Sequence, residues 1–265
     1  MTPSKHSAVI LLTGASSGIG AALAVALAPK GAHLLLTARS ADRLAELAQQ
    51  VRSAGGHATV LPLDLAAPGA ARQLFDEVQS LGISIDTLIN CAGFGLFGPL
   101  AGNDPARLSQ MLQLNVVALT ELTRLFLPEL LARRGTVLNI ASTAAFQPTP
   151  YMAAYGATKA YVLSFSEALW AEYRSRGLRV AAVCPGPVET PFLDALGGGA
   201  RSTPLLRATP LTVDEVVQAC LLALDSPGPT HIVGLRNWIM AQSARFTPRG
   251  LLARISGAFL APPAP

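Results

Sequence analysis

The chain has 265 residues, of which 51% are hydrophobic and 14% are charged, so it is long and apolar enough to bury a large core. No run approaches the roughly 18 apolar residues that cross a bilayer, and the N-terminus lacks the apolar region and cleavage site of a signal peptide. The net charge of +4 equals the four arginines of residues 236–265, where there is no Asp or Glu. This local excess argues against a nucleic-acid-binding face. Three widely spaced cysteines (Cys91, Cys184 and Cys220) argue against a disulfide framework and predict a cytoplasmic location.

Strand patterns alternate with helix patterns along the whole chain. The predicted strands are 8–13, 32–38, 57–62, 86–91, 135–141, 178–184 and about 230–234. The predicted helices are 18–29, 41–53, 68–81, 104–132, 152–176 and about 212–225. This alternation predicts an α/β fold: a single Rossmann-type domain over 1–265, with a doubly wound parallel sheet of about seven strands and helices on both faces.

A glycine-rich turn, TGASSGIG from Thr13 to Gly20, follows the first strand and precedes the first helix. Gly14 permits a tight turn, Gly18 lets the backbone approach a pyrophosphate, and Gly20 allows the helix to pack closely on the strand. The N–H groups of the following helix are then free to bind phosphate. In this strand–turn–helix context the motif predicts a dinucleotide site rather than a purely structural turn.

The end of the second strand indicates which dinucleotide is bound. NAD-binding sites usually place a carboxylate there, about 20 residues after the glycines, to bind the ribose 2′-hydroxyl. Here Ala38 occupies that place and Arg39 follows it. Because a guanidinium pairs with a 2′-phosphate, we expect NADPH or NADP+ as cofactor rather than NAD, the alternative being a solvated arginine at a strand end.

Tyr155 and Lys159 lie four residues apart in a predicted helix, so both side chains fall on one face. A lysine ammonium stabilises a neighbouring phenolate, which allows a tyrosine to exchange a proton with an alcohol or a ketone. By itself the pair is also typical of a solvated helix face, and the surrounding motifs decide between these interpretations.

Taken together, these motifs resemble those of the classical short-chain dehydrogenase/reductase family over about residues 7 to 235. Asp64-Leu65 follows the third strand, and Asn90-Cys91-Ala92-Gly93 ends the fourth, with Cys91 in place of the family's second asparagine. Ser142 ends the fifth strand, 13 residues before Tyr155. Asn115 lies in the predicted helix 104–132, which connects the fourth strand to the fifth. The segment after the sixth strand contributes Pro185, Gly186, Val188 and Thr190.

The resemblance implies a role for each of these residues. Ser142 orients the substrate oxygen, Tyr155 is its general acid or base, Lys159 binds the nicotinamide ribose and lowers the tyrosine pKa, and Asn115 connects Lys159 to solvent through water. No metal is expected. The cofactor-binding set that the motifs and the resemblance predict is Gly14, Ser16, Ser17, Gly18, Ile19, Gly20, Arg39, Asp64, Leu65, Asn90, Ala92, Gly93, Tyr155, Lys159, Pro185, Gly186, Val188 and Thr190.

Aromatic residues near these motifs predict an apolar substrate pocket formed by Phe94, Phe146, Tyr151 and Phe192, although each could equally fill the core. Residues 191–211, rich in glycine, proline and leucine, are expected to form a lid, in which Arg201 and Arg207 are the only cations. The expected substrate is an apolar small-molecule ketone or aldehyde, acyl-chain or steroid-like, or the corresponding alcohol.

Residues 236–260 extend beyond the simplest members of the family as a basic, helical segment. Leu251, Leu252, Ile255 and Phe259 are predicted to share one helical face with Arg249 and Arg254 beside them. We favour packing of this face against the protein or a second subunit, the alternative being peripheral contact with a membrane. The family resemblance implies a homodimer or homotetramer built on helices 104–132 and 152–176.

The leading hypothesis is therefore an NADPH-dependent reductase that interconverts an apolar carbonyl compound and its alcohol. Two alternatives remain at this point. One is an NAD(P)+-dependent alcohol dehydrogenase that works in the oxidative direction, which cellular cofactor ratios decide. The other is a nucleotide-binding scaffold without turnover, although such proteins usually lose the serine, tyrosine or lysine that this chain retains.

Overall fold

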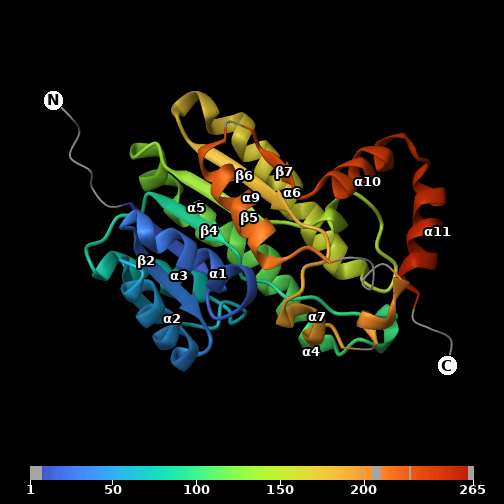
Figure 1. The fold of residues 1–265 in the computed structure, drawn as a ribbon, viewed down its shortest axis with the longest axis horizontal. Coiled ribbons are helices and arrows are strands. Elements are labelled where there is room, and N and C mark those ends of the chain that lie inside the picture. The colour runs from blue at the N-terminus through green and yellow to red at the C-terminus, as the bar shows by residue number, and fades with distance from the viewer. Residues whose placement is uncertain (1–7, 198, 205–209, 227, 262–265) are drawn as a thin grey trace.

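The computed structural model describes residues 8–197, 199–204, 210–226 and 228–261. Within these residues, one parallel sheet of seven strands has the order β3-β2-β1-β4-β5-β6-β7 (Figure 1). The strands are β1 (Val9–Thr13), β2 (His33–Ala38), β3 (His57–Pro62), β4 (Thr87–Asn90), β5 (Thr136–Ile140), β6 (Arg179–Cys184) and β7 (Thr230–Ile232). The strand order reverses direction between β1 and β4, which is where ligands bind in doubly wound sheets. The predicted fold class is confirmed.

Helices cover both faces of the sheet. One face carries α1 (Gly18–Leu27), α2 (Ala41–Ser53) and α9 (Val213–Asp225); the other carries α3 (Ala70–Ser80), α5 (Leu119–Ala132) and α6 (Ala153–Tyr173). Successive strand residues point to opposite faces, so Leu12 packs in the first layer and Leu11 in the second. The central strands are rich in leucine, isoleucine and valine because helices cover both faces of the sheet.

The long helix predicted over 104–132 is interrupted in its middle. It begins at α4 (Pro105–Leu112), where the Asp104 side chain accepts a hydrogen bond from the Ala106 N–H at 3.1 Å. A π-helical segment, η3 (Gln113–Ala118), then connects α4 to α5, and Asn115 lies within it. Single π turns of this kind are frequent at functional sites because they re-aim side chains within a helix.

The predicted lid is partly helical. It contains α7 (Pro191–Ala195) and the 3-10 turn η6 (Ala200–Ser202), while residues 198 and 205–209 lie outside the described part of the chain, and Arg207 with them.

The C-terminal extension forms two helices, α10 (Leu235–Phe246) and α11 (Arg249–Leu260), at the edge of the molecule away from β3 (Figure 1). Within the predicted face of α11, Leu252 is buried, whereas Leu251, Ile255 and Phe259 are exposed. Leu252, Ser256 and Leu260 form the buried edge of this face, and the other three lie beside it toward solvent. Among the residues described, no helix combines the length and apolarity needed to span a membrane.

Candidate active site

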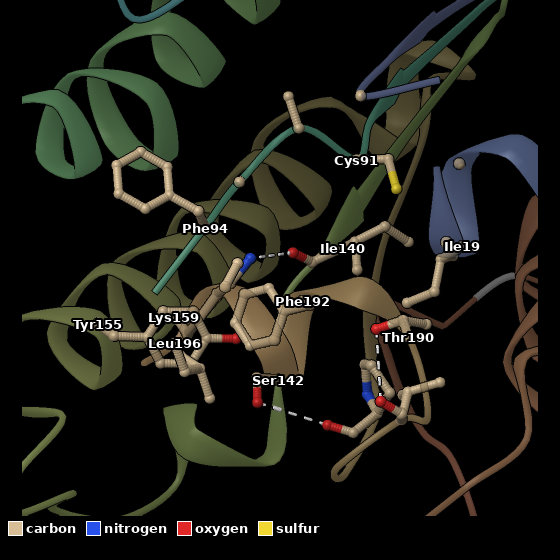
Figure 2. Close-up of a pocket in the computed structure, with 18 of the residues that line it drawn as sticks. Ile19, Cys91, Phe94, Ile140, Ser142, Tyr155, Lys159, Thr190, Phe192 and Leu196 are labelled. Carbon is tan, nitrogen blue, oxygen red and sulfur yellow. Dashed lines mark hydrogen bonds between the residues drawn. The ribbon is translucent and has the colours of Figure 1, made fainter. Parts of the chain in front are cut away.

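A cavity of about 680 Å³ lies where the carboxyl ends of the central strands meet. Its size is in the range of small-molecule and cofactor sites. Figure 2 shows side chains from the loop after β4, the end of β5, α6 and the segment after β6 converging on it. Of the twenty-four residues predicted for catalysis, cofactor and substrate, twenty line this cavity, so motifs spread over the sequence form one site. The four that do not are Asn90, Asn115, Phe146 and Tyr151.

The glycine turn forms one end of the cavity, and its shape excludes side chains. Gly14 has φ +69°, and a Cβ there would come within 2.7 Å of the Ala92 Cα. A Cβ at Gly20 would overlap the carbonyl oxygen of Gly14. The Thr13 hydroxyl accepts hydrogen bonds from the N–H groups of Cys91 and Ala92, each at 3.0 Å, and so fixes the β4 loop against the turn. Since α1 begins directly after the turn, its free N–H groups suit a phosphate.

Two guanidinium groups lie at the end of β2. Arg39 and Arg43 both line the cavity beside Thr37, Ala38 and Leu65. The Ser40 hydroxyl accepts a hydrogen bond from the Arg43 N–H at 3.4 Å, which starts α2 at this point. The Thr37 hydroxyl oxygen is buried without a hydrogen-bond partner among the described residues. The two guanidinium groups at this strand end are suited to an anionic group such as a phosphate.

Lys159 is buried at the cavity wall and is fixed by the end of β5. Its Nζ donates a hydrogen bond to the Ile140 carbonyl oxygen at 2.7 Å and lies 5.8 Å from the centre of the Tyr155 ring. Burial lowers the pKa of Lys159 to about 8. The ammonium form therefore still predominates at neutral pH.

Tyr155 is also buried, and burial raises the pKa of its phenol to about 12. The group that opposes this rise is Ser142, through a side-chain hydrogen bond. The expectation that Lys159 lowers the tyrosine pKa is therefore not met in the protein alone, because Lys159 is directed to Ile140 and desolvation dominates. The protein holds Tyr155 in its protonated form.

Ser142 stands at the end of β5 and begins the 3-10 turn η4 (Thr143–Ala145). Its hydroxyl accepts a hydrogen bond from the Ala144 N–H at 3.1 Å and donates one to the Pro185 carbonyl oxygen at 3.4 Å. Figure 2 shows Ser142 near the Tyr155 hydroxyl, with Phe192 beside them. The Phe192 and Tyr155 ring centres are 5.5 Å apart. A serine and a protonated tyrosine thus face one apolar space, an arrangement that can bind and protonate a carbonyl oxygen.

Neither Asn115 nor Asn90 lines the cavity, so Asn90 does not lie where a cofactor-binding residue was expected. The Asn115 amide accepts a hydrogen bond from the Phe94 N–H at 3.2 Å and donates to the Phe94 carbonyl oxygen at 2.9 Å and to Thr158 at 3.1 Å. It therefore holds the loop after β4. Asn90 donates to Asn139 at 2.9 Å and to Thr123 at 3.2 Å, beneath the cavity floor. As the last residue of β4, Asn90 is 3% exposed and turned into the helix layer.

Phe146 and Tyr151 were predicted as pocket residues, and neither lines the cavity. Phe146 packs against the cluster that contains Leu119 and Val162, between α5 and α6. The Tyr151 ring lies against Phe97 at a tilt of 36°, with ring centres 6.3 Å apart. Phe94 and Phe192 do line the cavity, as predicted. The difference arises because η4 turns the chain back before Phe146, directing that ring into the helix layer.

Several lining residues carry no motif in the sequence. Arg107 of α4 lies over the Phe94 ring, 4.4 Å from its centre, and Gln110 and Leu114 follow it along the cavity. The C-terminal extension contributes four more: Arg236, Asn237, Met240 and Leu260. The helical spacing of Arg107, Gln110 and Leu114 was the only signal that pointed to a common face.

Asn237 explains one of the predicted glycines. Its side-chain amide donates to the Val233 carbonyl oxygen at 2.7 Å. A Cβ at Gly186 would come within 2.7 Å of the same Nδ2 atom, so only glycine lets α10 approach the segment after β6 this closely. This contact connects the C-terminal extension to the cavity wall.

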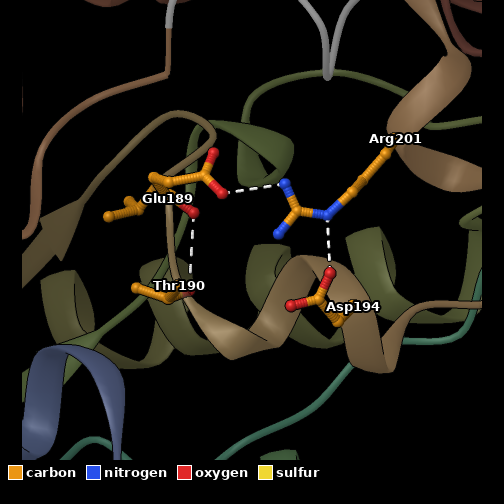
Figure 3. Close-up of polar contacts among 5 residues, drawn as sticks. Glu189, Thr190, Asp194 and Arg201 are labelled. Atoms are coloured by element: carbon orange, nitrogen blue, oxygen red, sulfur yellow. Dashed lines mark hydrogen bonds and ion pairs between the residues drawn. The ribbon is translucent and has the colours of Figure 1, made fainter.

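Arg201 connects the two described parts of the lid (Figure 3). Its Nη1 lies 2.8 Å from Glu189 Oε1 and its Nε lies 2.6 Å from Asp194 Oδ1. Glu189 lies between Val188 and Thr190, which line the cavity, and Asp194 belongs to α7, which places Phe192 over Tyr155. One guanidinium therefore holds η6, α7 and the segment after β6 together.

Comparison with known proteins agrees with this geometry. The family model described as short chain dehydrogenase matches residues 8–199. The chain is 36% identical over 180 residues to ketoacyl reductase HetN of Nostoc sp., a match that covers 68% of this chain and 63% of HetN, less than two thirds of that relative's length.

Two solved structures are similar over nearly their full lengths. A short-chain dehydrogenase from Sphingobium yanoikuyae in complex with NADPH is 31% identical with a TM-score of 0.79, covering 93% of this chain and 95% of that chain. The bulky-bulky ketone specific alcohol dehydrogenase from Comamonas testosteroni is 29% identical with a TM-score of 0.75, covering 93% and 94%. The chain belongs to the short-chain dehydrogenase family, as its motifs predicted.

Proposed function

We propose that the protein is an NADPH-dependent oxidoreductase that interconverts an apolar ketone or aldehyde and the corresponding alcohol. The observation that carries this proposal is the meeting of Ser142, Tyr155 and Lys159 in one cavity that also contains the glycine turn. A phosphate-binding turn explains a nucleotide, and the serine–tyrosine pair explains a proton transfer to oxygen.

The residues divide the reaction between them. When bound, the nicotinamide supplies or accepts the hydride, and the protein contributes position and electrostatics. Ser142 donates a hydrogen bond to the carbonyl oxygen and orients it. Tyr155 delivers the proton in reduction and removes it in oxidation; its pKa of about 12 favours the proton-donating form at neutral pH. Lys159, fixed by Ile140, would hold the nicotinamide ribose.

Asn115 has a positioning role in this proposal. It binds the Phe94 backbone from both sides, so it fixes the loop whose Gly93 and Phe94 line the cavity. The water-mediated path from Lys159 to solvent, which the family resemblance implies, stays a prediction. Asn90 would support the cofactor only indirectly, through the loop that follows it.

The cofactor preference is proposed from the charge at the end of β2. Arg39 and Arg43 supply two cations where a carboxylate would select the unphosphorylated ribose. The similar Sphingobium yanoikuyae structure contains NADPH, which supports the same choice.

The substrate is proposed from the apolar part of the cavity, formed by Phe94, Met152, Phe192, Leu196 and Leu260. These side chains line the same cavity as Tyr155, and Arg107 lies over the Phe94 ring as the neighbouring cation. The names of two similar proteins, a ketoacyl reductase and a bulky-ketone dehydrogenase, support an apolar or acyl-chain ketone.

A homo-oligomer is proposed through the helices predicted for that role. Leu112, Val117 and Tyr161 are exposed on α4, η3 and α6, and Tyr161 stacks on Phe165 with ring centres 5.7 Å apart. Exposed apolar side chains on adjacent helices are typical of a subunit interface.

The test is NADPH oxidation with a panel of apolar ketones and aldehydes, set against small charged keto acids. We expect turnover of the apolar compounds. Tyr155→Phe should abolish it while NADPH still binds with unchanged affinity, and Tyr173→Phe at the far end of α6 is the matched control. If the protein binds NADPH but does not oxidise it with any carbonyl compound of the panel, the non-catalytic scaffold is favoured. Preference for charged keto acids would overturn the substrate class.

A further inference from the structure

The two C-terminal helices carry an unusual concentration of exposed apolar side chains. Thirteen large hydrophobic residues are exposed in the described part of the chain, and seven of them lie in α10 and α11. We call these seven the C-terminal apolar surface: Leu235, Trp238, Ile239, Phe246, Leu251, Ile255 and Phe259. Scattered exposed hydrophobics are normal, but a cluster of this kind marks a binding surface.

Helix α11 is apolar on two adjacent sides, one buried and one exposed. Its inner side, with Leu252, Ser256 and Leu260, is buried, and Leu260 reaches the cavity. Its outer side carries Leu251, Ile255 and Phe259, which are 50%, 44% and 52% exposed. The packing that we favoured from the sequence therefore accounts for the inner side alone. The outer side still has apolar surface that the described protein does not cover.

Helix α10 continues the same character with charges at its margins. By helical periodicity, Leu235, Ile239 and Phe246 follow one side of the helix, and Arg236 and Arg245 fall on either flank of that stripe. Phe246 is 87% exposed, the highest value among the exposed large hydrophobics. An apolar stripe between arginines is the pattern of a helix that lies in a membrane interface.

The charge of this region indicates the occupant. Arg236, Arg245, Arg249 and Arg254 lie within residues 236–265, which contain no acidic residue. None of the ion pairs found among the described residues involves them. A two-fold contact of this surface with a second copy would bring arginines against arginines with no carboxylate between them. An anionic lipid headgroup layer satisfies both the charge and the apolar stripe.

We propose that α10 and α11 form a docking surface for an anionic membrane. The outer apolar side chains enter the headgroup–acyl boundary, Arg245, Arg249 and Arg254 bind lipid phosphates, and Trp238 lies at the level where indole rings are favoured. The inner side of α11 closes the cavity through Leu260, so docking brings the bilayer close to the cavity wall. Attachment is peripheral. Binding to the membrane does not depend on the proposed activity.

The experiment is co-flotation of the full chain with vesicles of phosphatidylcholine, with and without phosphatidylglycerol. We expect binding to the vesicles that contain phosphatidylglycerol and at least about tenfold weaker binding to phosphatidylcholine alone, because the arginines supply the electrostatic part. The double variant Phe246→Ser/Phe259→Ser should lose binding by a similar factor, as should Arg245→Glu/Arg254→Glu. None of these four residues lines the cavity, so soluble activity should be unchanged.

A matched control distinguishes this surface from general hydrophobicity. Leu222 on α9 is 73% exposed and lies outside the C-terminal apolar surface, so Leu222→Ser should bind vesicles like the wild type. Light scattering should give wild type and Phe246→Ser/Phe259→Ser the same mass. The proposal is overturned if the wild type ignores phosphatidylglycerol vesicles or if the double variants bind as well as wild type. If the wild type does not bind vesicles and light scattering gives Phe246→Ser/Phe259→Ser a lower mass than the wild type, the surface is a subunit contact instead.

Discussion

Lys159 Nζ donates a hydrogen bond to the carbonyl oxygen of Ile140 at 2.7 Å, which joins α6 to the last residue of β5. The contact fixes a cation in a buried position next to Tyr155 and the cavity. A buried ammonium is stabilised by this carbonyl but is also desolvated, and desolvation lowers its pKa to about 8. The protonation of Lys159 is thus coupled to the stability of the fold.

The first prediction follows from that coupling. Below about pH 8 both folded and unfolded chains carry the Lys159 proton, and burial of the charge costs stability. Between about 8 and the ordinary value of 10.5 the unfolded chain binds a proton that the folded chain has lost, so this contribution to stability rises with pH. Lys159→Met removes this pH-dependent contribution. We therefore expect the melting temperature of the wild type, minus that of the variant at the same pH, to increase from pH 7 to about pH 10. Parallel pH profiles for the two proteins would contradict the buried-cation account.

A second prediction concerns the cations at the end of β2. Arg39→Ala and Arg43→Ala should each raise the KM for NADPH about tenfold or more, because a charge-assisted contact with the 2′-phosphate is lost. The KM for NADH should change little. Steady-state kinetics with both cofactors measures this, with Arg72→Ala on the exposed face of α3 as the control. Equal losses with NADH would place the two arginines in a general structural role.

A third prediction tests the Arg201 contact across the lid. Arg201→Ala removes both ion pairs, to Glu189 and to Asp194, and frees α7 from the segment after β6. Because these pairs are exposed, the melting temperature should change little. The KM for an apolar ketone should rise severalfold, since Phe192 on α7 closes the cavity over Tyr155.

Salt provides an internal check on the Arg201 contact. Raising the ionic strength should move the wild-type KM toward that of Arg201→Ala, because exposed ion pairs are screened. The variant itself should be insensitive to salt. Arg72→Ala, which removes an exposed pair with Asp76 far from the lid, should leave the KM at its wild-type value. A salt-independent wild type would rule out a lid function for these ion pairs.

A fourth prediction uses the inner side of α11. Leu260 is fully buried and lines the cavity, whereas Leu252, about two turns upstream on the buried side of α11, is buried without lining it. Leu260→Ala and Leu252→Ala should each lower the free energy of unfolding by roughly 2–4 kcal/mol. Only Leu260→Ala should shift the ratio of kcat/KM values toward bulkier ketones, because it enlarges the cavity. Identical shifts in both variants would show that α11 acts through stability alone.

The sequence predicted the parts of the site that depend on short-range order. The TGASSGIG turn follows a buried strand directly, and Tyr155 and Lys159 are separated by one helical turn. Parallel strands bring their carboxyl ends to the same edge, so Ser142 and the segment after β6 had to meet these residues once the alternation of elements was read. These relationships follow from periodicity and chain direction alone.

Side-chain direction at the ends of elements was beyond that reasoning. Asn90 is the last residue of β4, and Phe146 follows the turn after β5. Both strands end at the cavity, yet packing directs these two side chains into the helix layer. Leu252 and Leu251 are neighbours in sequence on α11, yet Leu252 is buried and Leu251 is exposed. Only the tertiary contacts of each element decide which part of an apolar helix face is turned inward.

By itself, then, the sequence determined the sheet, the glycine turn and the spacing of the serine, tyrosine and lysine. The tertiary structure decided what surrounds them: Arg43 beside Arg39, Asn237 against Gly186, and Leu260 over the cavity. It also decided that Tyr155 stays protonated, because the pKa of a phenol depends on its burial and on neighbours that are distant in sequence. Local patterns record which residues share a helix face or a strand end, whereas desolvation and packing arise only when the whole chain has folded.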